Sequence, residues 1–145
     1  MKKTGKILFV IYILFMIYFL LFSDWYGRTG ALEDYRYNLV LFTEIRRFCR
    51  EWEILGWESV FMNLAGNVLI FVPFGFFMSW ARRNPNFFAV IGYSLGFSFL
   101  VEAFQLFSKV GSFDVDDLLL NTLGGLLGYI CFLIVRSGRR RHDKK

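Results

Sequence analysis

The chain has 145 residues, of which 56% are hydrophobic and 21% are aromatic, and it carries a formal net charge of +5. Soluble domains of this size are closer to half apolar. Here the apolar residues form long runs rather than amphipathic stripes. This pattern excludes an ordinary soluble fold and favours a protein surrounded by lipid. One histidine (His142) and two cysteines exclude a Ser-His-Asp triad and a zinc site, and we expect no metal ion and no cofactor.

Four apolar runs predict four transmembrane helices. The first covers residues 7–22 and follows a lysine-rich start; because no small-residue cleavage site comes after it, we expect a retained helix rather than the alternative, a cleaved signal peptide. The others cover residues 60–80, 87–107 and 118–135. Each is long enough to cross a hydrocarbon core of about 30 Å at a rise of about 1.5 Å per residue. We predict an all-α membrane protein with a single domain over residues 1–145.

Lysine and arginine are concentrated in three segments that four helices would place on one side of the membrane. These are the N-terminal tail, the connection with Arg82 and Arg83, and the tail 136–145; together they hold 11 of the 17 basic residues. Basic segments stay in the cytoplasm, so we predict that both ends of the chain lie inside. The basic tail is suited to contact anionic membrane lipids, and with no folded basic domain we expect no nucleic-acid binding.

The outer loop, residues 23–59, contains a segment with apolar residues at helical spacing and charged residues between them. The apolar positions are Ile45, Phe48, Cys49, Trp52 and Leu55. This pattern predicts an amphipathic helix that lies on the outer face of the membrane. Two interpretations stay open for it: a structural interfacial helix, or a lid over a functional site.

Polar side chains from three predicted helices fall at the same depth, in the outer third of the membrane. The set consists of Asn63, Asn67, Glu102, Gln105, Asp114, Asp117 and Asn121. Within a bilayer such groups face the interior of the bundle or a water-filled cavity. We therefore predict one polar pocket that opens to the outside and contains these residues.

Simpler roles exist for several members of this set. Asparagines in membrane helices often serve only as hydrogen-bonding contacts between helices. Asp116 and Asp117 are suited to a helix N-terminus, where the dipole favours negative charge. A carboxylate within the membrane, such as Glu102, is costly and indicates function by default. Asp114, Asp117 and Glu102 offer oxygen ligands to a divalent cation, but their spacing does not require one.

Four motifs occur in a fixed order along residues 36–135. They are Asn38-Leu39-Val40-Leu41-Phe42, Asn67-x-x-x-Phe71-x-Pro73-x-Gly75, Glu102-x-x-Gln105, and Phe113-Asp114-x-x-Asp117-x-x-x-Asn121-x-x-Gly124. Together they resemble the VanZ-like family of bacterial membrane proteins, whose founding member is associated with resistance to the glycopeptide teicoplanin. The resemblance implies a multi-pass protein of the bacterial cytoplasmic membrane.

The chain departs from the family pattern at two positions. Members often have proline where Leu41 stands, and often arginine where Ser112 stands. If that arginine contacts a ligand, this chain either lacks the contact or supplies it from Lys109 or from an arginine of the outer loop.

Three functions fit these observations. The first is a cell-envelope protein whose pocket recognises a membrane lipid, a lipid-linked cell-wall precursor or a glycopeptide, and which lowers susceptibility to glycopeptide antibiotics. The second is an intramembrane enzyme acting on a lipid-linked substrate, with Glu102 as acid or base and Asp117 as its partner. The third is a structural or partner-binding membrane module. The residues favour a protein without catalysis, and they do not indicate an oligomeric state.

Overall fold

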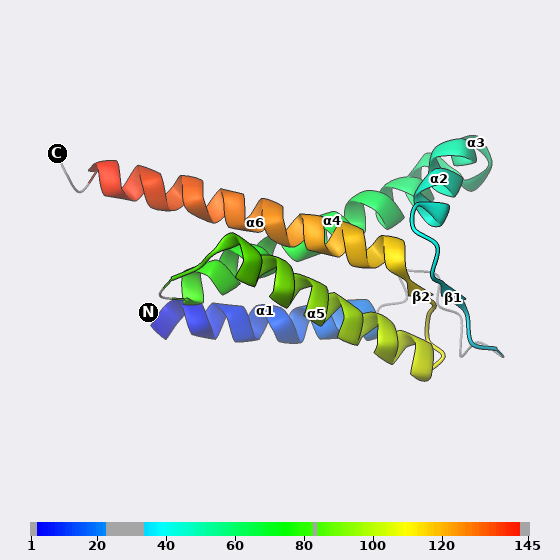
Figure 1. Cartoon of the computed structure of the whole chain (residues 1–145), viewed down its shortest axis with the longest axis horizontal. Helices are drawn as coiled ribbons and strands as arrows, with labels where there is room; N and C mark the ends of the chain where they lie inside the picture. Colours follow the sequence, from blue (N-terminus) through cyan, green and yellow to red (C-terminus); the bar gives the residue numbers. More distant parts are fainter. Residues whose placement is uncertain (1–2, 23–33, 83, 143–145) are drawn as a thin grey trace.

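The computed structural model describes residues 3–22, 34–82 and 84–142, and most of these are helical (Figure 1). The elements, in chain order, are α1 (Lys3–Phe22), β1 (Tyr37–Asn38), α2 (Thr43–Arg50), α3 (Trp52–Leu55), α4 (Trp57–Ala81), α5 (Phe87–Phe107), β2 (Phe113–Asp114) and α6 (Val115–His142). The four long helices lie side by side, and the short elements gather at one end of the bundle.

Three helices within the described ranges are long and apolar enough to cross a membrane. They are α4, α5 and the part of α6 that ends at Arg139. Many of their large apolar side chains point outward; Leu69, Phe88 and Leu100 are 56%, 81% and 65% exposed. Outward apolar side chains are expected where lipid is the solvent. The prediction of a multi-pass helical protein therefore holds for these three spans.

The last helix is longer than predicted at both ends. The side chain of Asp114 accepts a hydrogen bond from the backbone N–H of Asp116 at 2.8 Å. This is the bond that an N-cap residue makes, so the helix begins at Val115 instead of residue 118. At the other end, arginine is a good helix former and its charge complements the helix C-terminus. The helix accordingly continues into the segment predicted as a basic tail, as far as His142.

Helix α4 packs closely on α6 because glycines remove the side chains between them. A Cβ atom added at Gly124 would lie 2.1 Å from the carbonyl oxygen of Val68, and one at Gly128 would lie 1.9 Å from that of Val72. The second Gly-x-x-x-Gly pair of the chain, Gly92 and Gly96 on α5, meets nothing within 4 Å among the described residues. Of these two pairs, the one on α6 makes the close helix contact within the described chain.

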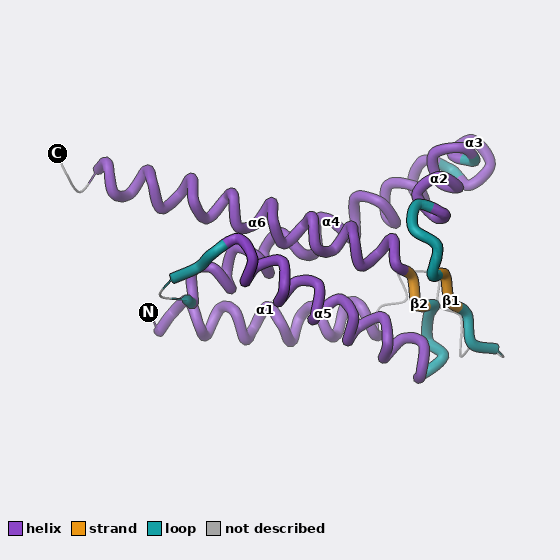
Figure 2. The backbone as a smooth tube through the Cα atoms, in the orientation of Figure 1, coloured by secondary structure: helices purple, strands orange, loops and turns teal. Residues whose placement is uncertain are grey.

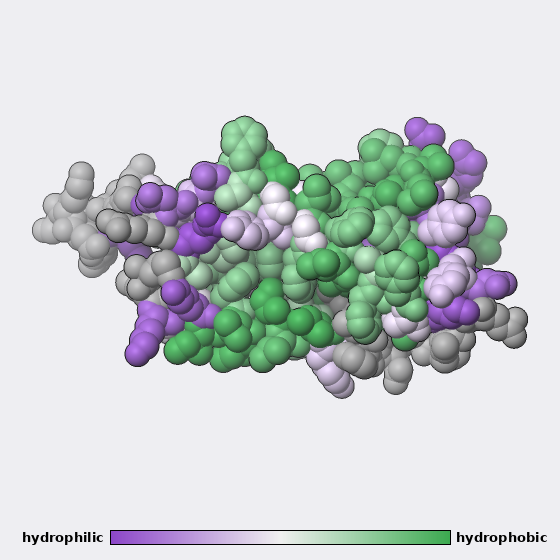
Figure 3. Space-filling view, turned by 60° about the horizontal axis from the view of Figure 1, so that its bottom comes forward, coloured by the Kyte–Doolittle hydropathy of each residue, from purple (hydrophilic) through white to green (hydrophobic). Residues whose placement is uncertain are grey.

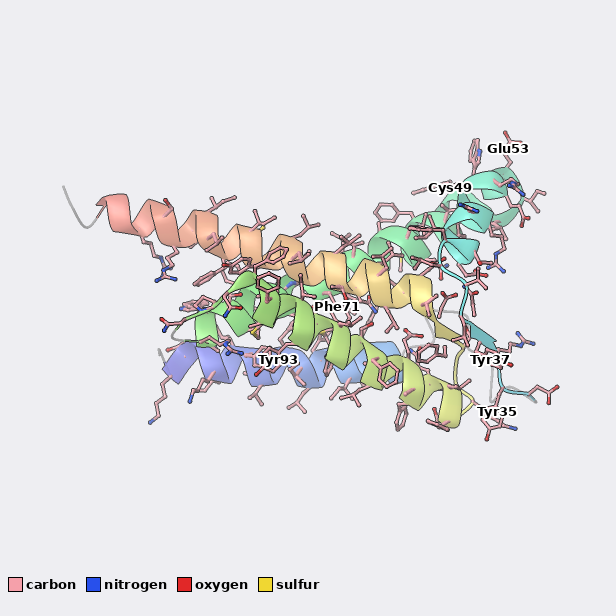
Figure 4. All side chains as sticks on the ribbon, in the orientation of Figure 1. Tyr35, Tyr37, Cys49, Glu53, Phe71 and Tyr93 are labelled. Carbon is pink, nitrogen blue, oxygen red and sulfur yellow. The ribbon has the colours of Figure 1, made fainter. Side chains whose placement is uncertain are left out.

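Helix α1 covers the other side of α4 through an aromatic core. Met16, Phe71, Phe74 and Val101 form the buried cluster. The hydroxyl of Tyr12 donates a hydrogen bond to the backbone carbonyl of Ile70. Figure 4 shows Phe71 between the helices. A tyrosine hydroxyl that bonds a carbonyl of the neighbouring helix ties α1 to α4 within the apolar layer.

The two ends of the molecule differ in what they carry. Both termini lie at one end, together with the connection from α4 to α5, and the strands with α2 and α3 lie at the other (Figure 1). At the terminal end, Arg82 stacks on Tyr93 at 4.9 Å and Arg139 on Trp80 at 5.8 Å. Hydrophobic residues cover the middle of the face shown in Figure 3, and hydrophilic ones gather toward both ends. This arrangement matches a membrane-spanning bundle.

Residues 34–56, before α4, hold structure that the sequence did not predict. Strands β1 and β2 pair in parallel, with Tyr37 opposite Phe113 and Asn38 opposite Asp114 (Figure 2). The predicted amphipathic helix is two short helices, because the chain turns at Glu51 between α2 and α3. Residues 23–33 of the predicted loop lie outside the described residues.

Candidate functional site

A cavity of about 370 Å³ opens at the end of the bundle that carries the strands. Segments far apart in the sequence enclose it: the β1 segment, α2, the start of α4, and the β2–α6 junction. Its lining residues are Arg36, Tyr37, Asn38, Glu44, Arg47, Phe48, Asn63, Ser112, Asp114 and Asp117. In Figure 4, Tyr37 and Tyr35 mark the strand side of this end, and Cys49 and Glu53 mark α2 and α3. Ten residues from four segments thus form one polar concavity.

Asp114 joins three segments beside this cavity. Its carboxylate accepts a hydrogen bond from the Asn38 amide at 3.1 Å, in addition to the one from the Asp116 N–H. Its own N–H donates to Oε2 of Glu102 at 3.1 Å. Burial raises the pKa of the Asp114 carboxyl above its usual range, and the bonds from Asp116 and Asn38 partly offset that effect.

Asp117 lies one helical turn further along α6 and also lines the cavity. The side-chain amide of Asn67 on α4 donates a hydrogen bond to its carboxylate. Asn63, one turn before Asn67, instead donates to the carbonyl of Ser59 in its own helix at 2.8 Å. One predicted asparagine therefore bridges two helices at the site, while the other contacts the cavity without such a bridge.

Asp116 is a residue whose importance the sequence analysis missed. It is fully buried, and its carboxylate accepts backbone hydrogen bonds from Phe42, from Glu44 at 2.9 Å and from Ile45 at 3.1 Å. These are the free N–H groups of the first turn of α2, so Asp116 caps that helix from a distance. Phe42 has φ 66°, a left-handed conformation that is unusual for a bulky residue. The signal was the Asp-x-Asp-Asp run itself, which we interpreted only as loop acids and helix N-terminal charges.

Helix α2 brings a mixed pair of charges to the cavity. Arg47 and Glu44 form an ion pair with 2.6 Å between Nη2 and Oε2. Burial is the main cause that raises the pKa of Glu44, and Arg47 acts in the opposite direction. Arg36, just before β1, brings a second guanidinium to the same lining.

The remaining predicted residues are buried and do not line the cavity. Glu102 is 3% exposed and holds the backbone of β2. Gln105 is 5% exposed, and its backbone carbonyl accepts a hydrogen bond from the backbone N–H of Gly111. Asn121 donates a hydrogen bond to Ser98 at 2.8 Å, which joins α6 to α5. The structure thus places Asn63, Asp114 and Asp117 at the cavity. The other predicted residues are buried polar side chains outside the lining: Glu102, Gln105, Asn67 and Asn121.

The chemistry of the lining is ionic and hydrogen-bonding. Within the described ranges, no group of three or more His, Cys, Asp or Glu side chains is placed to hold a metal ion. The lining offers a ligand two guanidinium groups, three carboxylates, two amides and two hydroxyls, which suits a charged or strongly polar group.

Comparison with known proteins agrees with the motif analysis. The sequence profile of the VanZ/LLP1 family matches residues 9–136, a range that includes every residue lining the cavity. The chain is 28% identical over 146 residues to Protein VanZ of Enterococcus faecium, a match that covers 99% of this chain and 81% of that protein. No solved structure matches the chain significantly.

Proposed function

Because the chain belongs to the VanZ/LLP1 family, we propose that it acts in the bacterial cell envelope and lowers susceptibility to teicoplanin-like glycopeptide antibiotics. The likeness to Protein VanZ over nearly the whole chain supports this link. The expectation for teicoplanin itself comes from the resemblance of the motifs. We further propose that the cavity at the strand end of the bundle is where the protein meets its ligand.

In this proposal the protein spans the cytoplasmic membrane four times, with α1 as the fourth span. Helix α1 has 20 residues, and its packing on α4 through Met16 and Phe74 supports a place in the same apolar layer. The basic residues at the terminal end, such as Arg82 and Arg139, support a cytoplasmic position for both termini. The cavity then faces outward, and α2 and α3 lie at the outer surface of the membrane.

The observation that carries the proposal is the position of the charged cavity. It lies at the end of the bundle opposite the termini, and its walls are made by the motif residues Asn38, Asp114 and Asp117. A lipid, a lipid-linked cell-wall precursor or a glycopeptide approaches the membrane from that side. A polar concavity bordered by spanning helices is suited to such ligands, because it offers charged partners at the edge of the apolar layer.

Glu102 takes a positioning role in this proposal. Its carboxylate is buried and accepts the N–H of Asp114, so it holds β2 and α6 in register beside the cavity. An acid or base must come within hydrogen-bonding distance of the substrate, and the residues of the lining are better placed for that contact. We therefore favour ligand recognition over the intramembrane enzyme with Glu102 as acid or base.

The test is the minimum inhibitory concentration of teicoplanin for a glycopeptide-susceptible Gram-positive host that expresses the full chain. We expect the wild-type protein to raise it above the empty-vector value by more than one doubling dilution. Asp117→Asn keeps the shape and the Asn67 contact but removes a charge from the lining, and should abolish protection. Glu53→Gln, on the exposed side of α3, is the matched control and should protect like the wild type.

Two further variants separate positioning from acid–base chemistry. Glu102→Gln keeps a carbonyl that can accept the N–H of Asp114, whereas Glu102→Leu has no acceptor. We expect protection with the first and loss with the second, at equal membrane levels. Loss with both would favour the enzyme, and no protection by the wild type would refute the antibiotic link for this chain.

A further inference from the structure

The charged groups of the cavity differ in whether the protein itself supplies their partners. Glu44 and Arg47 form an ion pair with each other. Asp114 accepts hydrogen bonds from Asn38 and from the backbone of α6, and Asp117 accepts one from Asn67. These four charges are therefore compensated, at least in part, within the folded chain.

Arg36 is the exception among the charged lining residues. Its guanidinium has no hydrogen-bond or ion-pair partner among the residues that the structure describes, although it lines the cavity. Its backbone is fixed, because its carbonyl accepts the N–H of Phe113 at 3.0 Å next to the β1–β2 pair. A guanidinium on an anchored backbone, beside Ser112 in the same lining, is placed to bind an anion with several N–H donors.

A second cation lies close to this segment. The ammonium of Lys109 stacks on the ring of Tyr35 at 4.9 Å, and Tyr35 directly precedes Arg36 in the chain. Two positive charges, those of Arg36 and Lys109, thus lie near the β1 segment at this end of the bundle. Their field opposes that of the three lining carboxylates and favours an anion next to the Arg36 guanidinium.

We propose that Arg36 binds a phosphate group in this cavity, and that the phosphate belongs to the headgroup of a membrane lipid. The inference rests on the proposed function, since it names the ligand class of the same cavity. Spanning helices α4 and α6 both begin at this cavity, and lipid phosphates lie at that level, just outside the hydrocarbon core. Tyr37, a lining residue that is 66% exposed, offers an apolar surface with a polar hydroxyl at the same boundary.

The experiment measures binding of soluble probes to the full chain, purified in a neutral detergent, by isothermal titration calorimetry. The main probe is dihexanoyl phosphatidylglycerol, a phosphodiester with short acyl chains; dihexanoylglycerol has the same chains without the phosphate. Inorganic phosphate tests a free anion, and an N-acetylated dipeptide with a free carboxylate tests the other anion that arginine binds. We expect the phosphatidylglycerol probe to bind at one site and dihexanoylglycerol not to bind.

Arg36→Gln should weaken binding of the phosphatidylglycerol probe about tenfold or more, the scale of losing hydrogen bonds from a charged donor. Arg36→Lys should weaken it less, because the charge remains but the planar fork of donors is lost. Arg46→Gln is the matched control. Arg46 lies on α2 and lines a different depression, so this variant should bind like the wild type. Equal melting temperatures of the variants would show that folding is intact.

Each outcome bears on the proposal. Binding of inorganic phosphate as tight as that of the lipid, and dependent on Arg36, would keep the phosphate site but assign it to a free anion. Unchanged binding in Arg36→Gln, an equal loss in Arg46→Gln, or a preference for the carboxylate peptide would overturn it. Phosphate binding that depends on Arg36 in a protein that gives no teicoplanin protection would refute the proposed function alone. Protection that survives Arg36→Gln while phosphate binding is lost would separate the phosphate site from the resistance activity.

Discussion

The side-chain amide of Asn67 donates a hydrogen bond to the carboxylate of Asp117, and this bond joins α4 to α6 beside the cavity. Asn67 is 5% exposed, and Asp117 is partly buried. The bond matters in two ways. It connects the helix pair that the glycines of α6 bring together, and it supplies a partner to a carboxylate at the edge of the apolar layer.

Replacing Asn67 should therefore destabilise the bundle, while replacing its neighbour on the same helix should not. Asn67→Leu leaves the Asp117 carboxylate without this donor, and we expect a loss of roughly 0.6–2 kcal/mol. Asn63→Leu removes only a bond to its own helix, so its change should stay within about 0.5 kcal/mol. Thermal unfolding in detergent, monitored by circular dichroism, measures both. Equal effects of the two substitutions would contradict the interhelical role of Asn67.

Asp116 is expected to control the order of α2. Asp116→Ala removes the acceptor of the N–H groups of Phe42, Glu44 and Ile45, and the loss of such a cap costs about 0.5–2 kcal/mol. Hydrogen–deuterium exchange at residues 42–45 should accelerate in this variant. The same amides should be unaffected by Glu58→Ala, which changes an acid in the first turn of α4. Unchanged exchange at these amides in Asp116→Ala would show that α2 is held by other contacts.

The two glycine pairs should respond differently to alanine. Gly124→Ala and Gly128→Ala place a methyl group against backbone carbonyls of α4, and such overpacking costs about 1–3 kcal/mol. Gly92→Ala and Gly96→Ala meet open space within the described chain and should leave the melting temperature unchanged or slightly higher. A large loss for the α5 variants would reveal a contact on that face, for instance with a second copy of the chain.

Binding of a phosphodiester at Arg36 should tighten as the pH falls. The charged groups around it are Arg47, Glu44, Asp114 and Asp117. Because burial raises the pKa of both Glu44 and Asp114, these carboxyls gain protons on acidification before ordinary carboxyls do. Each proton removes a negative charge that competes with the ligand, while the arginines keep theirs. Titration with dihexanoyl phosphatidylglycerol, whose own charge is constant, from about pH 8 to about pH 5 measures the effect.

A substitution identifies the source of that pH dependence. Glu44→Gln has no titrating group at this position, so its affinity should be higher at neutral pH and should change less on acidification. A pH dependence identical to that of the wild type would assign the effect to Asp114 or Asp117 instead.

The orientation can be tested by labelling cysteines from outside sealed cells. In a background without Cys49 and Cys131, a membrane-impermeant reagent should modify Glu53→Cys on α3. It should spare Asn84→Cys, between α4 and α5, and Lys3→Cys, at the start of α1. Labelling of Asn84→Cys, with Glu53→Cys spared, would show the reverse orientation. Labelling of Lys3→Cys together with Glu53→Cys, with Asn84→Cys spared, would mean that α1 does not cross the membrane.

Much of the fold could be predicted because lipid makes local demands on a sequence. Runs of apolar residues long enough to cross the bilayer were sufficient to locate α4, α5 and α6, and the structure confirms all three as candidate spans. The family could be recognised for a similar reason: its motifs are short patterns within single helices or turns, and the VanZ/LLP1 match confirms it. The polar residues of the site were found because any polar group in an apolar run is conspicuous.

The roles of those residues depended on the tertiary structure. Asn38 and Asp114 are 76 positions apart, and no local pattern predicts that β1 and β2 pair there. That pairing and the N-terminus of α2 decide which carboxylates serve the backbone, as Asp116 does, and which line the cavity, as Asp117 does. The sequence by itself determined which segments are apolar enough for the membrane and where charge is concentrated, since these follow from composition along the chain. Only the three-dimensional arrangement decided the partner of each charge, because a hydrogen bond requires two groups within about 3 Å, whatever their separation in the sequence.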